Sequence, residues 1–300
     1  MGTSSAFGGQ SGGTPLIPSW LDDDSTLSIA PDGAQPSGEL PNPPSSDILA
    51  DSTLSPDAPL TPPVFRPIPP AADPTRFSAA RSNLSRFAGS GGKDYRSLGR
   101  AVSHYVGSSL GGARTAATRM GAARIVSGHL LGFLSDAVAR GATAALSALK
   151  LDSLAGRPIE EVFLGLADYV CPEGGSIDEG IAREAFIETI ADLAGAGITN
   201  LDVLTVDQMY TVFELYATNA IEARLCNDIG MKAIILPTNS HEATKVQAQL
   251  HDFIHRGVSD ALTTARAMSV ALTPSSLSQF VEHVYEQAFG ILQTIGDAEA

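Results

Sequence analysis

The chain has 300 residues, a formal net charge of −14 at pH 7 and 43% hydrophobic residues. Its two cysteines are too few for a disulfide framework and do not form a C-x-x-C motif, which is typical of proteins in a reducing cytosol. A secretory signal is not recognisable, and the longest uncharged apolar stretch near the centre, residues 141–149, is too short to cross a bilayer. We therefore expect a cytoplasmic protein without a membrane partner.

The first predicted segment is a tail that does not fold. Residues 1–74 contain 15 of the 19 prolines, nine acidic residues and a single basic residue, Arg66. Proline removes backbone donors, and so few large apolar side chains cannot offset the entropy of ordering the chain. We predict a disordered acidic tail over residues 1–74, with polyproline II character around residues 62–70.

The charge of the remaining chain changes sign along the sequence. Residues 75–130 contain nine basic residues against one acid, Asp94, a net charge of +8, whereas residues 131–300 have a net charge of −14. We predict that residues 75–150 form a basic helical segment. An acidic helical segment over residues 151–300 is expected to pack with it, as one bundle or as two lobes.

In the basic segment, local signals mark where helices begin and end. Asp73-Pro74 predicts the start of a first helix that ends near Gly89, and Asp94 predicts the start of a second that ends at Gly111-Gly112. Alanine-rich stretches with leucine and phenylalanine at helical spacing predict further helices over about 113–120 and 122–150.

The acidic segment carries stronger helix signals. Pro158 begins a helix that Pro172 ends, and capping boxes at Ser176–Glu179 and Thr205–Gln208 begin two more. Later helices begin near Asn239 or Ser240 and at Thr273-Pro274. The short apolar run 232–237 is either a strand or a buried connector. The predicted fold class is therefore all-α, a helical bundle behind the tail.

One helical pattern places two imidazoles together. His251 and His255 lie at positions i and i+4, the spacing of two zinc ligands on a helix, but the metalloprotease motif requires glutamate where Asp252 stands. Exposed helix histidines are the simpler interpretation, and we predict no metal site. A third ligand would have to come from His241, Glu242 or His283.

The basic segment contains a candidate face for an anion or a protein partner. Two of its arginines lie at positions i and i+4, and three more recur every five residues. The alternative interpretation is intramolecular pairing with the acidic residues of the chain. The five residues are Arg96, Arg100, Arg114, Arg119 and Arg124.

The N-terminal residues form the second candidate site. Gly2 is small enough for removal of Met1, which would leave an unhindered glycine amine. Further along, the only tryptophan, Trp20, lies beside Leu16 and Ile17 in a segment that otherwise avoids large apolar residues, which indicates a docking motif. The remaining chain shows no recognisable catalytic constellation, and we predict a protein that is not an enzyme.

The sequence resembles the QatB family of the bacterial Qat anti-phage defence system. The resemblance is carried by short motifs spread over most of the chain, although the proline-rich spacer and the last helices match only in character. These motifs are residues 2–9, 15–20, 94–101, 105–106, 111–114, 119–121 and 171–175, followed by the helix that begins at Ser176.

The resemblance implies partners and a modification. QatB-like proteins are expected to work beside an ATPase, a TatD-like nuclease and QatC, which is similar to the queuosine-pathway enzyme QueC. QueC-like enzymes use ATP to activate a 7-deazaguanine carboxylate and join it to an amine, so the resemblance implies covalent 7-deazaguanine on Gly2 and no cofactor of the chain's own. The residues expected to contact the partner are Thr3, Ser4, Ser5, Gly8, Gly9, Leu16, Ile17 and Trp20.

Two other functions are consistent with the sequence. In the first, the helical body is a structural adaptor that bridges defence subunits, and the tail carries no modification. In the second, the five arginines present nucleic acid to the nuclease, which predicts affinity that falls steeply with salt.

Overall fold

The computed structural model describes residues 73, 75–171, 175–230, 234, 236–268 and 274–298. The chain divides into two units, Met1–Arg66 and Pro67–Ala300, and every described residue belongs to the second. Within the described residues all regular elements are helical, which confirms the all-α prediction. The predicted disordered tail lies outside the described residues, except for its penultimate position.

The helices follow one another with short connections. In chain order they are α1 (Ser78–Gly89), α2 (Tyr95–His104), the π-helical turn η1 (Tyr105–Ser109), α3 (Ala113–Arg119), α4 (Gly121–Arg140), α5 (Ala142–Ala148), the 3₁₀ turn η2 (Asp152–Leu154), α6 (Ile159–Val170), α7 (Ile177–Gly195), the 3₁₀ turn η3 (Leu201–Val203), α8 (Val206–Ile229), α9 (Ser240–Met268) and α10 (Pro274–Ala298).

The capping signals work as the sequence predicts. The Asp94 carboxylate accepts a hydrogen bond from the backbone N–H of Ser97 at the start of α2. Both capping boxes are formed, with Ser176 and Glu179 at the start of α7 and Thr205 and Gln208 at the start of α8. Each box satisfies backbone donors that a helix start leaves without partners, so these helices begin where the sequence places them.

Two expected boundaries differ from the structure. The predicted helix over 122–150 is divided into α4 and α5 at Gly141, whose φ of 90° is closed to most other residues and interrupts the helix. The first helix begins at Ser78 rather than at Asp73-Pro74, because the Asp73 carboxylate accepts the backbone N–H of Thr75 in a turn that precedes the helix.

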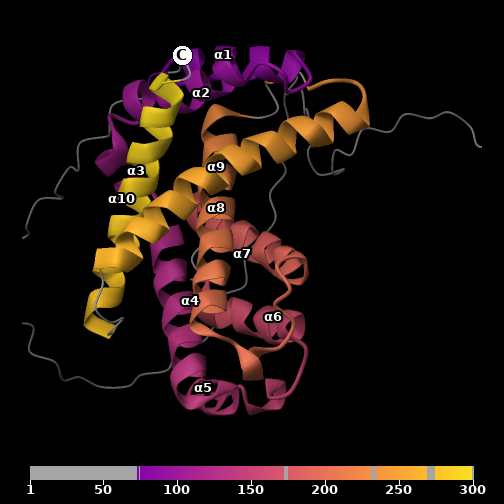
Figure 1. The fold of residues 1–300 in the computed structure, drawn as a ribbon, viewed down its shortest axis with the longest axis vertical. Coiled ribbons are helices and arrows are strands. Elements are labelled where there is room, and N and C mark those ends of the chain that lie inside the picture. Colours follow the sequence, from indigo (N-terminus) through magenta and orange to yellow (C-terminus); the bar gives the residue numbers. More distant parts are fainter. Residues whose placement is uncertain are drawn as a thin grey trace, which may run out of the picture. The chain divides into compact units, whose positions relative to one another are not determined.

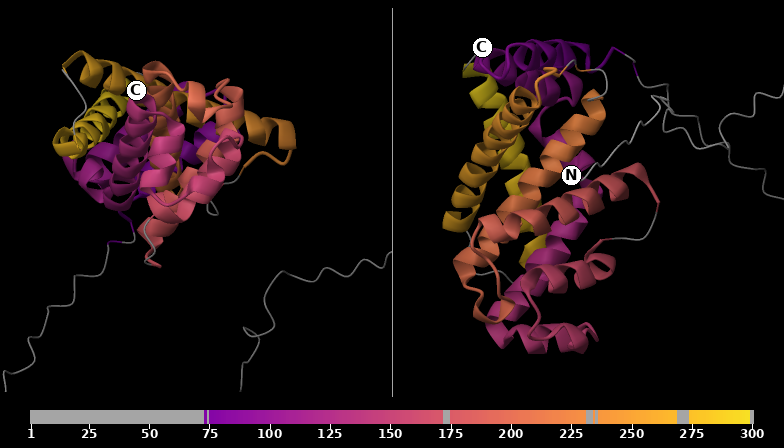
Figure 2. Two further views of the ribbon diagram at one scale, coloured as in Figure 1. Left: turned by 90° about the horizontal axis from the view of Figure 1, so that it is seen from below. Right: turned by 90° about the vertical axis from the view of Figure 1, so that its right-hand side faces the viewer.

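The helices pack as a bundle in which α4, α8 and α10 each contact several other helices. α10 packs against α2, α3, α4 and α9, and α8 packs against α4, α7 and α9. Figure 1 shows α1 and α2 at one end of this unit and α5 and α6 at the other, with α4, α8 and α10 between them, and the right-hand view of Figure 2 shows the same order from a second side. None of the described helices combines the length and apolar character of a membrane span.

The buried side chains form one continuous cluster that includes residues from α1 to α10. Aromatic rings connect neighbouring helices within it. Phe163 of α6 stacks on Phe186 of α7 with centroids 5.9 Å apart, and Phe186 meets the edge of Tyr216 of α8 at 6.3 Å. Because these rings are fully buried, they contribute to the stability of α6, α7 and α8 together.

Candidate functional site

The N-terminal candidate site lies outside the described residues. This applies to the proposed modification acceptor Gly2 and to the predicted partner-binding residues Thr3, Ser4, Ser5, Gly8, Gly9, Leu16, Ile17 and Trp20. They remain predictions from the sequence.

The predicted arginine face is divided among three helices. Arg96 and Arg100 lie on α2, which begins after Asp94. Hydrogen bonds from Ser97 lower the pKa of Asp94, and the charges of Arg100 and Arg96 lower it further. Arg114 is exposed on α3, and Arg119 lies at the end of the same helix.

The last of the five arginines has an acidic partner. Arg124 of α4 lies with its Nη1 3.6 Å from Oε1 of Glu282 on α10. This contact is of the intramolecular kind that the alternative interpretation expects. The Arg124 side chain is 28% exposed and Glu282 is 54% exposed, so solvent screens the pair and its contribution to stability is small.

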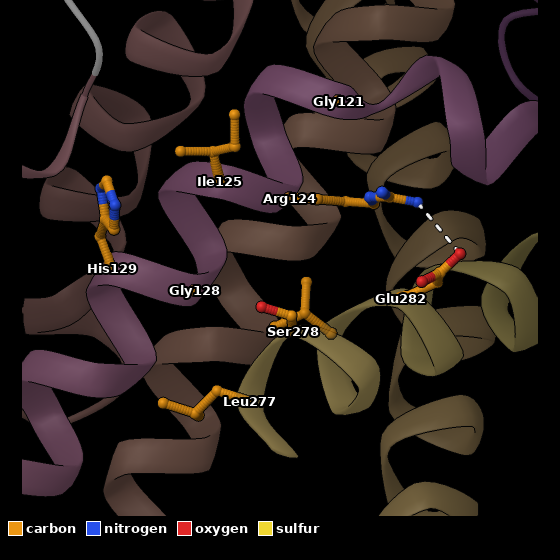
Figure 3. Close-up of a pocket in the computed structure, with 9 residues that line it drawn as sticks. Gly121, Arg124, Ile125, Gly128, His129, Leu277, Ser278 and Glu282 are labelled. Carbon is orange, nitrogen blue, oxygen red and sulfur yellow. Dashed lines mark ion pairs between the residues drawn. The ribbon is translucent and has the colours of Figure 1, made fainter. Parts of the chain in front are cut away.

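Arg124 also lines a pocket between α4 and α10 with a volume of about 490 Å³. Figure 3 shows Arg124 pointing toward Glu282 at one end of the pocket, with Ser278 and Leu277 on the α10 side and His129 at the far end of the α4 side. The pocket lining consists of Gly121, Arg124, Ile125, Gly128 and His129 from α4 and Leu277, Ser278, Val281 and Glu282 from α10.

The framework around this pocket is held by polar contacts. Ser127 and Tyr285, both buried, are hydrogen-bonded through their hydroxyl groups at 3.1 Å and so join α4 to α10. On the other side, His129 donates from Nδ1 to the carbonyl oxygen of Val170, 3.1 Å away, at the end of α6. The first contact fixes the two walls of the pocket relative to each other, and the second fixes the His129 ring against α6.

The lining of this pocket is chemically mixed. It presents a cation, an anion, a hydroxyl and the side chain of Ile125, which is 50% exposed. Among the described residues, Ser278 has no hydrogen bond to His129 or to any other group that would activate it. The sequence analysis named Arg124 but missed Glu282 and Ser278. For the α4 side of the pocket a signal was available, because the spacing of Gly121, Arg124 and Gly128 places them on one helix face.

The two helix histidines each have an acidic partner on α8. His251 Nδ1 lies 2.8 Å from Glu222 and His255 Nε2 lies 3.1 Å from Glu214. These hydrogen bonds raise the pKa of both histidines, against the effect of burial. No group of three or more metal-ligating side chains is found in the part of the chain that the structure describes, and the pairs serve to join α9 to α8.

We expect the stability of the protein to depend on these pairs above neutral pH. A histidine whose pKa is raised by folding stabilises the folded state fully below its unfolded pKa, about 6.5, and loses that contribution as the pH rises through its folded pKa. The free energy of unfolding, measured in urea between pH 6 and pH 9, should fall by about 1 kcal/mol for the two screened pairs together.

The double variant His251→Gln/His255→Gln tests this expectation. It should be less stable than the wild type at pH 6 and nearly equal to it at pH 9. His241→Gln is the control, because no acidic side chain pairs with this exposed ring among the described residues. If the double variant and the wild type have the same free energy of unfolding at every pH from 6 to 9, the two histidine pairs do not cause the fall in stability.

Comparison with known proteins identifies the family. Residues 111–292, more than half of the chain, match the model of the family described as "Qat anti-phage system associated protein QatB". The matched range begins just before α3 and ends within α10, so it includes the α4–α10 pocket and both histidine pairs. No curated protein and no solved structure matches the chain. The chain belongs to the QatB family of Qat anti-phage system associated proteins.

Proposed function

We propose that this protein is a non-catalytic component of the Qat defence complex and that its N-terminal glycine is presented to a QueC-like partner, QatC, for conjugation to a 7-deazaguanine. Membership in the QatB family carries this proposal, because it makes the other Qat subunits the partners of this chain. The system's ATPase and its TatD-like nuclease are the further partners that we propose.

In this proposal the chemistry belongs to the partner. QatC consumes ATP to place a phosphate-bearing group on the deazaguanine carboxylate. The amine of Gly2, freed by removal of Met1, then attacks the activated carbonyl carbon; the bond to the phosphate-bearing group breaks, that group leaves, and the nitrogen loses a proton to give the amide. Glycine suits this role because it has no Cβ, so its backbone can approach an active site more closely than the backbone of any other residue. The small residues that follow Gly2 would pass through the active-site channel, and the segment around Trp20 would bind further out on the same partner.

The mass of the N-terminal peptide tests the proposal. The protein is purified from cells with and without QatC, and a deazaguanine-sized increment on Gly2 is expected only with QatC. The variant Gly2→Phe should carry no increment and should fail to protect cells from phage, whereas the matched variant Gly13→Phe should keep both properties.

Three results would count against the proposal. If Gly2 remains unmodified in the presence of active QatC while protection persists, the structural adaptor is the better description. An increment that persists in Gly2→Phe would place the acceptor elsewhere in the chain. Protection that depends instead on the five arginines would favour the nucleic-acid-binding subunit.

A further inference from the structure

A groove runs along α8, between α7 and α9. α8 packs against both α7 and α9, so it forms the floor and the other two helices form the walls. Two adjoining cavities of about 270 and 140 Å³ share Glu188, Asn219, Glu222 and Gln247, and together they form the polar part of the groove.

The walls and floor of this polar part are acidic. Glu184, Glu188 and Asp192 follow one another at four-residue spacing along α7, and Glu222 rises from α8. Glu222 is bound to His251, and Asp192 accepts a hydrogen bond from Asn219 at 2.9 Å. Glu184 and Glu188 are exposed and make no hydrogen bond or ion pair with the described residues.

The groove continues into an apolar pocket near the end of α8. This pocket has a volume of about 510 Å³ and shares Glu222 and Cys226 with the acidic part, so the two are one feature. Leu236, which also lines it, is 41% exposed. The other apolar side chains of its lining include Leu84, Ala88, Ile234, Val246 and Leu250.

The electrostatic field of the acidic walls extends to this pocket. Burial, followed by the negative charges of Glu222 and Glu184, raises the pKa of Cys226 to about 12. The thiol at the junction is therefore neutral at pH 7 mainly because it is buried, and the carboxylates that face the groove add to this effect. An occupant of the pocket is exposed to a local excess of negative charge, which favours positive groups.

We propose that this groove binds a basic segment of a protein partner, with one large apolar side chain in the pocket and lysine or arginine side chains along α7. From Glu184 to Asp192 the helix rises by about 12 Å, a length that about four residues of an extended peptide cover. The occupant therefore has an apolar anchor and basic residues within four or five positions of it.

Charge complementarity disfavours the chain's own tail as the occupant, because residues 1–74 carry nine acidic residues and one basic residue and would be repelled by the acidic walls. A second copy of the chain has a net charge of −14, and most basic residues of its segment 75–130 lie on helices rather than in an extended segment. The inference does not depend on modification of Gly2, because the groove would bind its partner whether or not the N-terminus is conjugated.

A peptide array with the purified full-length protein tests the inference. Each eight-residue peptide contains one Leu, Phe or Trp and three Lys or Arg residues in a Gly/Ser background, and the set of peptides covers every spacing between them. Its counterpart carries Glu in place of the basic residues, and overlapping peptides from residues 1–72 of the chain are included. The anchored basic peptides are expected to bind, and their Glu counterparts are not.

Two variants connect the binding to the groove. The affinity of the best peptide, measured by fluorescence anisotropy, should fall about tenfold in Glu184→Gln/Glu188→Gln, with a weaker dependence on salt. Ala243→Phe, which fills the apolar pocket from α9, should reduce it by a similar factor while the melting temperature confirms folding. The control Asp202→Asn/Asp260→Asn removes the same charge from exposed positions elsewhere and should stay within twofold of the wild type.

The inference is overturned if the basic peptides bind no better than their Glu counterparts, or if the groove variants and the control change affinity equally. Tighter binding of a peptide from residues 1–72 would overturn the external partner and assign the groove to the chain's own segment. Each of these results is distinguishable from failure of the conjugation at Gly2, which is measured by mass.

Discussion

Replacing Arg224 by methionine is expected to lower the free energy of unfolding by about 3 kcal/mol. Arg224 of α8 donates from Nε to Asp228, 3.1 Å away, and from Nη1 to Asp178 in the first turn of α7. The hydroxyl of Tyr105, at the start of η1, donates to the same Asp228 oxygen at 2.9 Å. One arginine therefore holds the carboxylates of two helices and supports a buried tyrosine.

The size of the effect follows from burial. The side chains of Arg224 and Asp228 are 14% and 11% exposed. Although burial acts in the opposite direction, the charges and hydrogen bonds of Asp228 and Asp178 raise the pKa of Arg224, so it remains charged. Without it, the Asp228 carboxylate keeps only the Tyr105 hydroxyl and stays shielded from water, and an uncompensated charge in such a place is costly.

Arg140→Met is the matched control. Arg140 and Asp136 of α4 are also an arginine–aspartate pair four residues apart, but both side chains are 51% exposed. This variant should lose at most about 0.5 kcal/mol. Urea unfolding at pH 7 measures both changes, and equal losses for the two variants would show that burial of the Arg224 network is not what stabilises the fold.

Replacing Gly296 by alanine is expected to destabilise the protein by about 2 kcal/mol. Gly296 lies where α10 crosses α2, and a Cβ at this position would be 2.8 Å from Cβ of Ser103 and closer still to the carbonyl oxygen of Gly99. Backbone atoms cannot rotate away, so the two helices would have to separate. That movement would also break the hydrogen bond from Ser103 to Asp297.

A second glycine of α10 provides the control. A Cβ on Gly290 would meet nothing nearer than Cβ of Ala113, at the ordinary contact distance of 3.9 Å. Gly290→Ala should therefore stabilise the protein by about 0.5–1 kcal/mol, because alanine favours the helix. Thermal and urea unfolding should both show that Gly296→Ala lowers the stability of the protein and that Gly290→Ala raises it. Two changes of the same sign would contradict the close crossing of α2 and α10.

The helices themselves were predictable because their signals are local. The Asp94 cap and the boxes at Ser176 and Thr205 each join residues at most three positions apart, so the sequence contains the whole interaction. The break at Gly141 was missed because a glycine within an apolar helical pattern is compatible with both a continuous helix and a positive-φ turn.

The sites show the same division. From the sequence alone, His251 and His255 belong on one helix face and Arg124 belongs to the basic segment. Glu222, Glu214 and Glu282 become their neighbours only when α8, α9 and α10 pack. The all-α class, most helix boundaries and the family were therefore predictable, because caps, periodicity and motifs are short-range signals. Which charges pair and where a groove opens depend on how the helices pack, because those contacts join residues far apart in the chain.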